Sequence, residues 1–159
     1  MNYTKTPYWS IKTPEQYVRY LVNVNKGTDS PVLKNKLIEY AHTLDVSVDP
    51  KMTKNEIFEA IIEKSKSESE TSKKIAEKFK LGISSLAYQR KFGITNDEVK
   101  RMARLGYISK TGEERFRAFN KDCYAPLYNI WEYFELTVDE VKMWLTENPK
   151  GTRKPKQIK

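Results

Sequence analysis

A phrase of nine residues occurs twice in this chain, as FGITNDEVK at residues 92–100 and as FELTVDEVK at residues 134–142. In each copy a threonine is followed three residues later by a glutamate, the spacing of a capping box that starts a helix. The valine after each glutamate begins the apolar stripe of that helix, and the phenylalanine ends the helix before it. Each copy therefore predicts two helices joined by a tight turn.

The composition excludes several classes of protein. The chain has 159 residues, and no apolar run approaches the roughly 20 residues that a membrane-spanning helix needs. The first residues, MNYTKTPYWSIKT, lack the apolar stretch of a secretory signal, so we expect a cytoplasmic protein without a membrane partner. One cysteine and one histidine leave no internal disulfide and no usual zinc site.

Catalytic signatures are also missing from the sequence. Cys123 and His42 fall in different expected modules, and no glycine-rich phosphate loop or nucleophile with a base is visible. Most carboxylates lie at expected helix starts, where the helix dipole favours them. We therefore expect a protein that is not an enzyme and that uses no cofactor and no metal.

The positive charge is concentrated in two segments. The net charge is +8 for the whole chain, +7 for residues 73–118 and +5 for residues 148–159, against −4 for residues 119–147. A localised positive field attracts polyanions, of which nucleic acid is the usual partner. The alternative is that lysine only keeps the surface hydrated.

The chain is expected to be mainly α-helical, with one short β-hairpin. The turn-forming segment KGTDSP and the polar run KSKSESETS are expected to separate its helices. Residues 1–28 are expected to form an aromatic-rich leader with one helix capped by Thr13, and residues 29–65 a helix-extended loop-helix module. A linker at residues 66–72 is expected to lead to a second domain at residues 73–147 and a basic tail at residues 148–159.

The first module has two apolar-striped helices around the loop DVSVDPKM, the second helix starting at Thr53. Residues 32–65 resemble the helix-extended loop-helix group, which includes the SAP, HeH and LEM modules and the N-terminal module of the Rho termination factor. The features that carry the resemblance are Leu37, Ala41, Val46, Lys51, Met52, Thr53, Lys54, Glu56 and Ile57.

This resemblance implies contact with nucleic acid at the loop and at the start of the second helix, where Lys51, Thr53 and Lys54 lie. The module is nearly neutral, however, and carries acids such as Asp45 and Glu59 among these residues. Some members of the group bind protein instead. RNA binding through this module is therefore kept as an alternative.

The first copy of the phrase resembles the helix-turn-helix of DNA-binding proteins, with Gly93 in the turn and Thr95 as the cap. In the helix that follows, Val99, Met102 and Ala103 fall on the inner face at helical spacing. The expected outer stripe carries three cations beside one acid, at Asp97, Lys100, Arg101 and Arg104. Arginine can bond a guanine edge in two places, so this stripe is suited to a groove-entering helix.

A β-hairpin is expected directly after that helix. The sequence predicts a strand at residues 107–108, a turn at residues 111–112, and a strand in which Arg115 and Arg117 alternate with apolar residues. Residues 83–119 in this order resemble winged helix-turn-helix proteins, especially excisionase-like and MerR-like modules. The resemblance implies a regulatory protein of a phage or mobile element, with both arginines on phosphates or in the minor groove.

The second copy of the phrase lacks a cationic stripe. It is expected to follow a helix within YAPLYNIWEYFEL, and its own helix has Trp144 on the apolar face. Three aromatic residues, Trp131, Tyr133 and Trp144, exceed what one small core needs, so they are candidates for a protein interface or a homodimer contact.

The function expected is sequence-specific binding of double-stranded DNA by a regulator that acts by occupying its site. An adaptor that binds protein through the C-terminal helices is the other alternative. The candidate nucleic-acid-binding residues are Asn96, Lys100, Arg101, Arg104, Lys110, Arg115, Arg117, Lys51, Thr53, Lys54, Lys150, Arg153 and Lys154.

Overall fold

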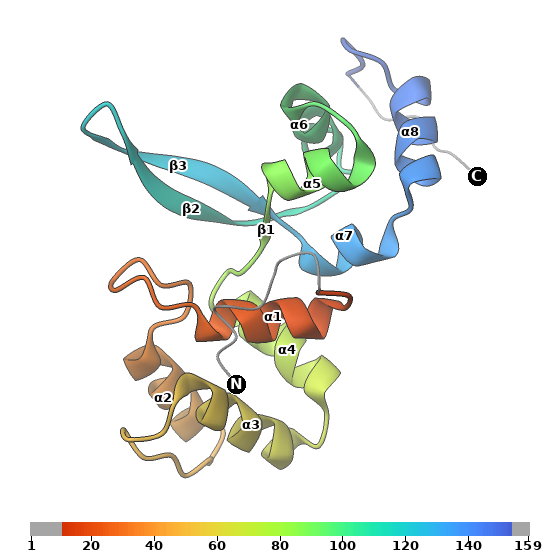
Figure 1. Ribbon diagram of the computed structural model, residues 1–159. Helices are drawn as coiled ribbons and strands as arrows, with labels where there is room; N and C mark the ends of the chain where they lie inside the picture. The colour runs from red at the N-terminus through yellow and green to blue at the C-terminus, as the bar shows by residue number, and fades with distance from the viewer. Residues whose placement is uncertain (1–10, 154–159) are drawn as a thin grey trace. The chain divides into compact units, whose positions relative to one another are not determined.

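The computed structural model describes residues 11–153, which form eight helices and one three-stranded antiparallel sheet (Figure 1). This confirms the expected fold class, mainly α with a short hairpin. The chain divides into two compact units between Leu81 and Gly82. Within residues 11–153 no helix is both long enough and apolar enough to cross a membrane.

Unit 1 is built from four helices. They are α1 (Pro14–Asn23), α2 (Lys34–Thr43), α3 (Lys54–Ser65) and α4 (Glu68–Lys78). The Thr13 and Gln16 side chains form a reciprocal capping box at the start of α1, and Thr53 and Glu56 do the same for α3. Residues 44–53, between α2 and α3, form neither helix nor strand.

The expected linker at residues 66–72 is wrong, because most of it is helical. Ser67 caps α4 by accepting a hydrogen bond from the Glu70 backbone N–H, and Glu68 and Glu70 lie in the first turn. Acids there are stabilised by the helix dipole. The polar run is therefore a helix start, and its Ser-x-x-Glu spacing is the signal in the sequence that indicates this.

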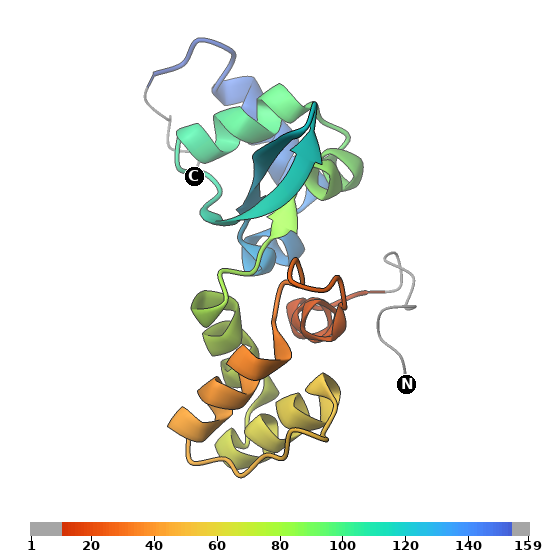
Figure 2. The ribbon, with the colours of Figure 1, turned by 90° about the vertical axis from the view of Figure 1, so that its left-hand side faces the viewer.

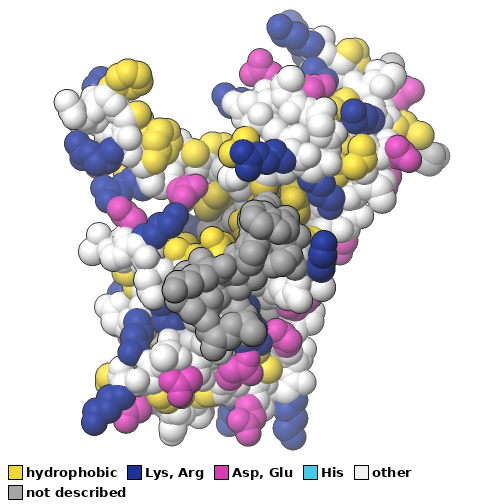
Figure 3. Space-filling view, in the orientation of Figure 1, with side chains coloured by type: hydrophobic (Ala, Val, Ile, Leu, Met, Phe, Trp, Pro, Cys, Tyr) yellow, Lys and Arg dark blue, Asp and Glu magenta, His cyan; other side chains and the backbone are white. Residues whose placement is uncertain are grey.

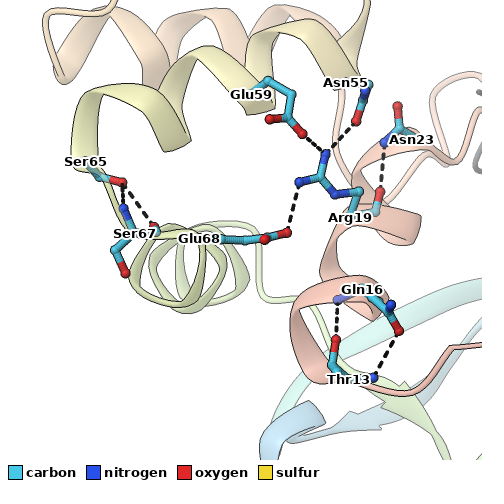
Figure 4. A network of polar contacts seen from close by, with 9 residues as sticks. All are labelled: Thr13, Gln16, Arg19, Asn23, Asn55, Glu59, Ser65, Ser67 and Glu68. Carbon is cyan, nitrogen blue, oxygen red and sulfur yellow. Dashed lines mark hydrogen bonds and ion pairs between the residues drawn. The ribbon is translucent and has the colours of Figure 1, made fainter.

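Arg19 of α1 ties the helices of unit 1 together (Figure 4). Its guanidinium donates to Asn55 and Glu59 of α3 and to Glu68 of α4, the last at 2.9 Å, and it lies over the Phe58 ring. Burial alone would lower the pKa of Arg19, but the hydrogen bonds to the two carboxylates and their charges together raise it. Arg19 therefore remains charged and joins three helices.

Lys54 is part of the core of unit 1. Its side chain is only 8% exposed, and its ammonium donates to the main-chain carbonyls of Val24 and Val32, both at 2.8 Å. Burial lowers the pKa of this ammonium. The expectation that Lys54 contacts nucleic acid is therefore wrong, because its ammonium is engaged in closing the loop before α2.

Unit 2 contains the sheet, in the order β1 (Ile83–Ser84), β3 (Lys121–Tyr128), β2 (Lys110–Ala118). A Cβ atom at Gly82 would lie 2.7 Å from the Leu127 Cβ and 2.9 Å from the Tyr128 carbonyl oxygen, so only glycine lets β1 approach β3. The β2–β3 ribbon projects beyond the helices of this unit (Figures 1 and 2).

Two helix pairs complete unit 2. They are α5 (Ser85–Phe92) with α6 (Asn96–Arg104), and α7 (Ile130–Glu135) with α8 (Val138–Glu147). Gly93 ends α5 in the left-handed conformation, with φ of 64°, and the reciprocal capping box of Thr95 and Glu98 starts α6. The Thr137–Glu140 box starts α8 in the same way. The two helices joined by a tight turn are therefore present at both copies of the phrase.

The expected position of the hairpin is wrong. The turn lies at Phe119 and Asn120, whose φ angles are 54° and 60°, and not at residues 111–112, which lie within β2. The helix expected within YAPLYNIWEYFEL is wrong over its first part, since residues 121–128 form β3 and α7 begins only at Ile130. Pro126 is a poor residue inside a helix but is tolerated in a ribbon.

We expect the change Lys54→Ala to lower the free energy of unfolding of unit 1 by about 1–3 kcal/mol, because two carbonyls lose a charged donor. Hydrogen exchange across residues 14–65 measures this. The matched control Lys51→Ala removes an exposed lysine three residues earlier and should change stability by less than about 0.5 kcal/mol. Equal effects of the two changes would contradict the structural role of Lys54.

Candidate nucleic-acid interface

Helix α6 presents one polar ridge to solvent. Asn96, Lys100 and Arg104 follow each other at intervals of four residues and are all exposed, while Val99 and Met102 are fully buried on the other side. The Asn96 side-chain oxygen accepts a hydrogen bond from the Ser85 hydroxyl of α5, so the first residue of the ridge is held against the preceding helix. Amide, ammonium and guanidinium groups along one ridge can bond base edges in a major groove.

Arg101 does not belong to this ridge. Its side chain is 14% exposed, it lies 3.9 Å from the Glu98 carboxylate, and its Nε atom is buried without a hydrogen-bond partner. The expected stripe of three cations is therefore wrong at Arg101. The physical reason is the helical phase, because Arg101 is adjacent to buried Met102 and lies at the margin of the inner face.

The β2–β3 hairpin carries a second cationic group. Arg115 and Arg117 are exposed on β2, and both guanidiniums contact the Asp122 carboxylate of β3, at 3.3 and 3.2 Å. Arg117 also donates to the Asn120 carbonyl at 3.1 Å. One carboxylate thus orients two arginines on the same face of the ribbon.

The tip of the hairpin also exposes aromatic rings, which sequence reasoning missed as functional residues. Phe119 is 96% exposed, Tyr124 60% and Phe116 47%. Basic and hydrophobic side chains gather on the projecting ribbon in the space-filling view (Figure 3). The signal in the sequence is Asn120, which tolerates positive φ and marks a two-residue turn between RFRA and KDCY.

The remaining candidate cations belong to other segments than α6. Lys110 is exposed but pairs with Glu113 at 3.3 Å, and Lys150 and Arg153 are exposed after α8. In unit 1, Lys51 is exposed in the loop before α3, and the Thr53 hydroxyl is occupied as the helix cap. The prediction for Lys154 lies outside the described residues.

The three aromatic residues expected at a protein interface are mostly core residues. Tyr133 is buried against Tyr88 and Phe92, with ring centroids 5.2 and 6.1 Å apart. Trp144 is 4% exposed and stacks on Tyr107 at 4.6 Å. Trp131 is partly buried. The interface prediction is therefore wrong for Tyr133 and Trp144, because the helix pair α7–α8 supplies the core of unit 2.

Lys91 illustrates a cation that the scaffold uses. Its ammonium donates to the Tyr133 carbonyl and lies 4.6 Å from the Tyr133 ring centroid and 5.0 Å from that of Phe92. Burial lowers the pKa of Lys91. Lys91 therefore joins α5 to α7. Because its ammonium is engaged in this contact, the positive surface charge of unit 2 comes from other residues.

The described residues contain no group of three or more His, Cys, Asp and Glu side chains placed to hold a metal ion. Comparison of the chain with protein-family models, with curated proteins and with solved structures finds no significant match.

We expect Tyr88→Phe to destabilise unit 2, because it removes a hydrogen bond between α5 and the residue that precedes α7. Tyr88 is fully buried, and its hydroxyl donates to the Asn129 carbonyl at 3.1 Å. Burial raises the pKa of Tyr88 well above its ordinary value, with the nearby Glu132 charge adding to the rise. The change should lower the free energy of unfolding at pH 7 by about 1 kcal/mol.

The same substitution has an expected pH dependence. Unfolded Tyr88 ionises near the ordinary tyrosine pKa of 10.0 while folded Tyr88 stays protonated, so its contribution to stability is complete below pH 10.0 and is lost as the pH rises further. The stability difference between wild type and Tyr88→Phe should therefore shrink above pH 10.0. Urea unfolding followed by tryptophan fluorescence measures it, and a difference that stays constant would contradict a buried, protonated Tyr88.

Proposed function

We propose that unit 2 binds double-stranded DNA, with α6 in the major groove and the β2–β3 hairpin against the neighbouring backbone. The observation that carries this proposal is the exposed ridge of Asn96, Lys100 and Arg104 on the second helix of a helix-turn-helix. A groove admits one helix face, and this ridge offers donors suited to adenine and guanine edges.

The hairpin supports the proposal through its position and charge. It follows α6 directly in the chain, as the wing does in the excisionase-like and MerR-like modules that the sequence resembles. The arginines oriented by Asp122 can hold phosphates, which fixes the register of the protein but reads no sequence. Base readout is therefore assigned to α6 and positioning to the hairpin.

The biological role proposed is that of a cytoplasmic, non-catalytic regulator that acts by occupying its DNA site. The excisionase-like resemblance supports an origin in a phage or mobile element. Lys150 and Arg153 after α8 are exposed and would add contacts with phosphates. Unit 1, which keeps Lys51 exposed in its loop, would add further contacts or recruit a partner.

The two alternatives have less support. An adaptor that uses the aromatic C-terminal helices needs exposed rings, but Tyr133 and Trp144 are buried. RNA binding at the start of α3 needs free donors, but Lys54 is bonded to two carbonyls and Thr53 caps its helix.

Selection from random duplex DNA tests the proposal, followed by gel-shift titration of the selected site. We expect Arg104→Ala to lower the preference for that site by about 10- to 100-fold, the effect of losing one bidentate base contact. Lys100→Ala should weaken the salt dependence of DNA binding, because one cation fewer displaces counterions from the DNA. The slope of log Kobs against log salt concentration should fall in magnitude by about 1.

Lys64→Ala is the control, since Lys64 is an exposed lysine on α3 of unit 1 and should leave both quantities unchanged. A selection without a reproducible motif, or a preference that survives Arg104→Ala, would overturn the assignment of α6 as the reading helix. Preferential selection of single-stranded RNA would favour the RNA alternative.

A further inference from the structure

The turn of the β2–β3 hairpin contains a residue that is unfavourable for its backbone conformation. Phe119 and Asn120 are the two central turn residues, and both have positive φ, 54° and 60°. Two-residue turns of this kind favour asparagine or glycine, because a side chain with a Cβ is strained at positive φ. Asn120 satisfies this preference and Phe119 does not.

Packing within the described part of unit 2 does not offset the strain at Phe119. The residue is 96% exposed, so its ring contributes almost no packing to the fold. A bulky residue held at positive φ is uncommon, and such strain often marks a functional position. The ring at the tip is therefore kept at a cost to local stability that packing among the described residues does not offset, and a contact with a binding partner would offset it.

The surroundings of the ring indicate the chemistry of that contact. From Glu113 to Phe119 the ribbon extends about 20 Å, at about 3.3 Å per residue. Two of its acids, Glu113 and Glu114, lie toward the base of the ribbon, whereas the third, Asp122, lies near the tip and pairs with Arg117. Arg117 and Lys121 both lie within two residues of Phe119. An apolar ring flanked by cations at the end of an arm is complementary to a base stack between phosphates.

We infer that Phe119 is a wedge that enters between base pairs and bends the duplex that unit 2 binds. Apolar side chains that enter from the minor groove unstack one base step and kink the helix. Arg117 would hold the backbone beside the opened step, since Asp122 and the Asn120 carbonyl engage only two of its five N–H donors. This inference rests on the proposed DNA binding and adds deformation of the DNA to it.

The test uses the full chain and a duplex with TA steps at its centre, because these steps unstack most easily. One adenine is replaced by 2-aminopurine, whose fluorescence rises when it is unstacked, and dyes at the duplex ends report bending by energy transfer. We expect wild type to increase both signals on saturation. Phe119→Asn should abolish both while the protein still binds.

Phe119→Asn also removes the unfavourable residue from the turn, so its Tm should equal or exceed that of wild type, which excludes misfolding as the cause. Phe119→Leu should restore both signals in large part, because leucine is also used as a wedge. The control Met143→Ser removes an exposed apolar side chain from α8 and should change nothing.

The outcomes separate this inference from the proposed function. Binding without any fluorescence change, or with a change that Phe119→Asn retains, would overturn the wedge and leave DNA binding intact. Absence of duplex binding would remove both. A self-association of the chain that Phe119→Asn disrupts, without unstacking, would identify the ring as a contact between copies and overturn the wedge.

Discussion

Strand β3 pairs with β1 on one side and β2 on the other, and the geometry of unit 2 depends on this pairing. The β1 contact joins the sheet to α5, because β1 ends at Ser84, which caps that helix through the Ala87 N–H. The β2 contact continues to the turn, well past the helices. The same strand therefore holds the start of α5 at one end and extends the hairpin at the other.

The part of the fold that could be predicted from sequence is the part specified by local hydrogen bonds. The threonine caps at Thr13, Thr53, Thr95 and Thr137 are all predictable, because each is paired with a glutamine or glutamate three residues later. The same spacing at Ser67 is harder to interpret, since a polar run also fits a linker. Capping indicates where a helix starts, and it does so without knowledge of the rest of the chain.

What could not be predicted depends on partners distant in sequence. The periodicity of residues 124–134 fits a helix, but β-pairing with residues 110–118 takes the first five of them into a strand. Lys54 looks like a surface lysine until α3 packs beside the carbonyls of Val24 and Val32. Arg101 lies at the margin of the inner face of α6. Whether a side chain at such a margin is exposed depends on how far the neighbouring core extends, and the sequence of the helix alone does not give this.

The duplicated phrase shows how a shared local rule leaves function open. In both copies the threonine and glutamate start a helix, and the valine after them is buried. Beyond that point α6 continues with Lys100 and Arg104 on its outer ridge, whereas α8 turns Trp144 and Leu145 into the core. The same capping box starts both helices, so the difference lies in the residues that follow. The core that α8 helps to build supports α5, and Lys100 and Arg104 on the outer ridge of α6 remain exposed.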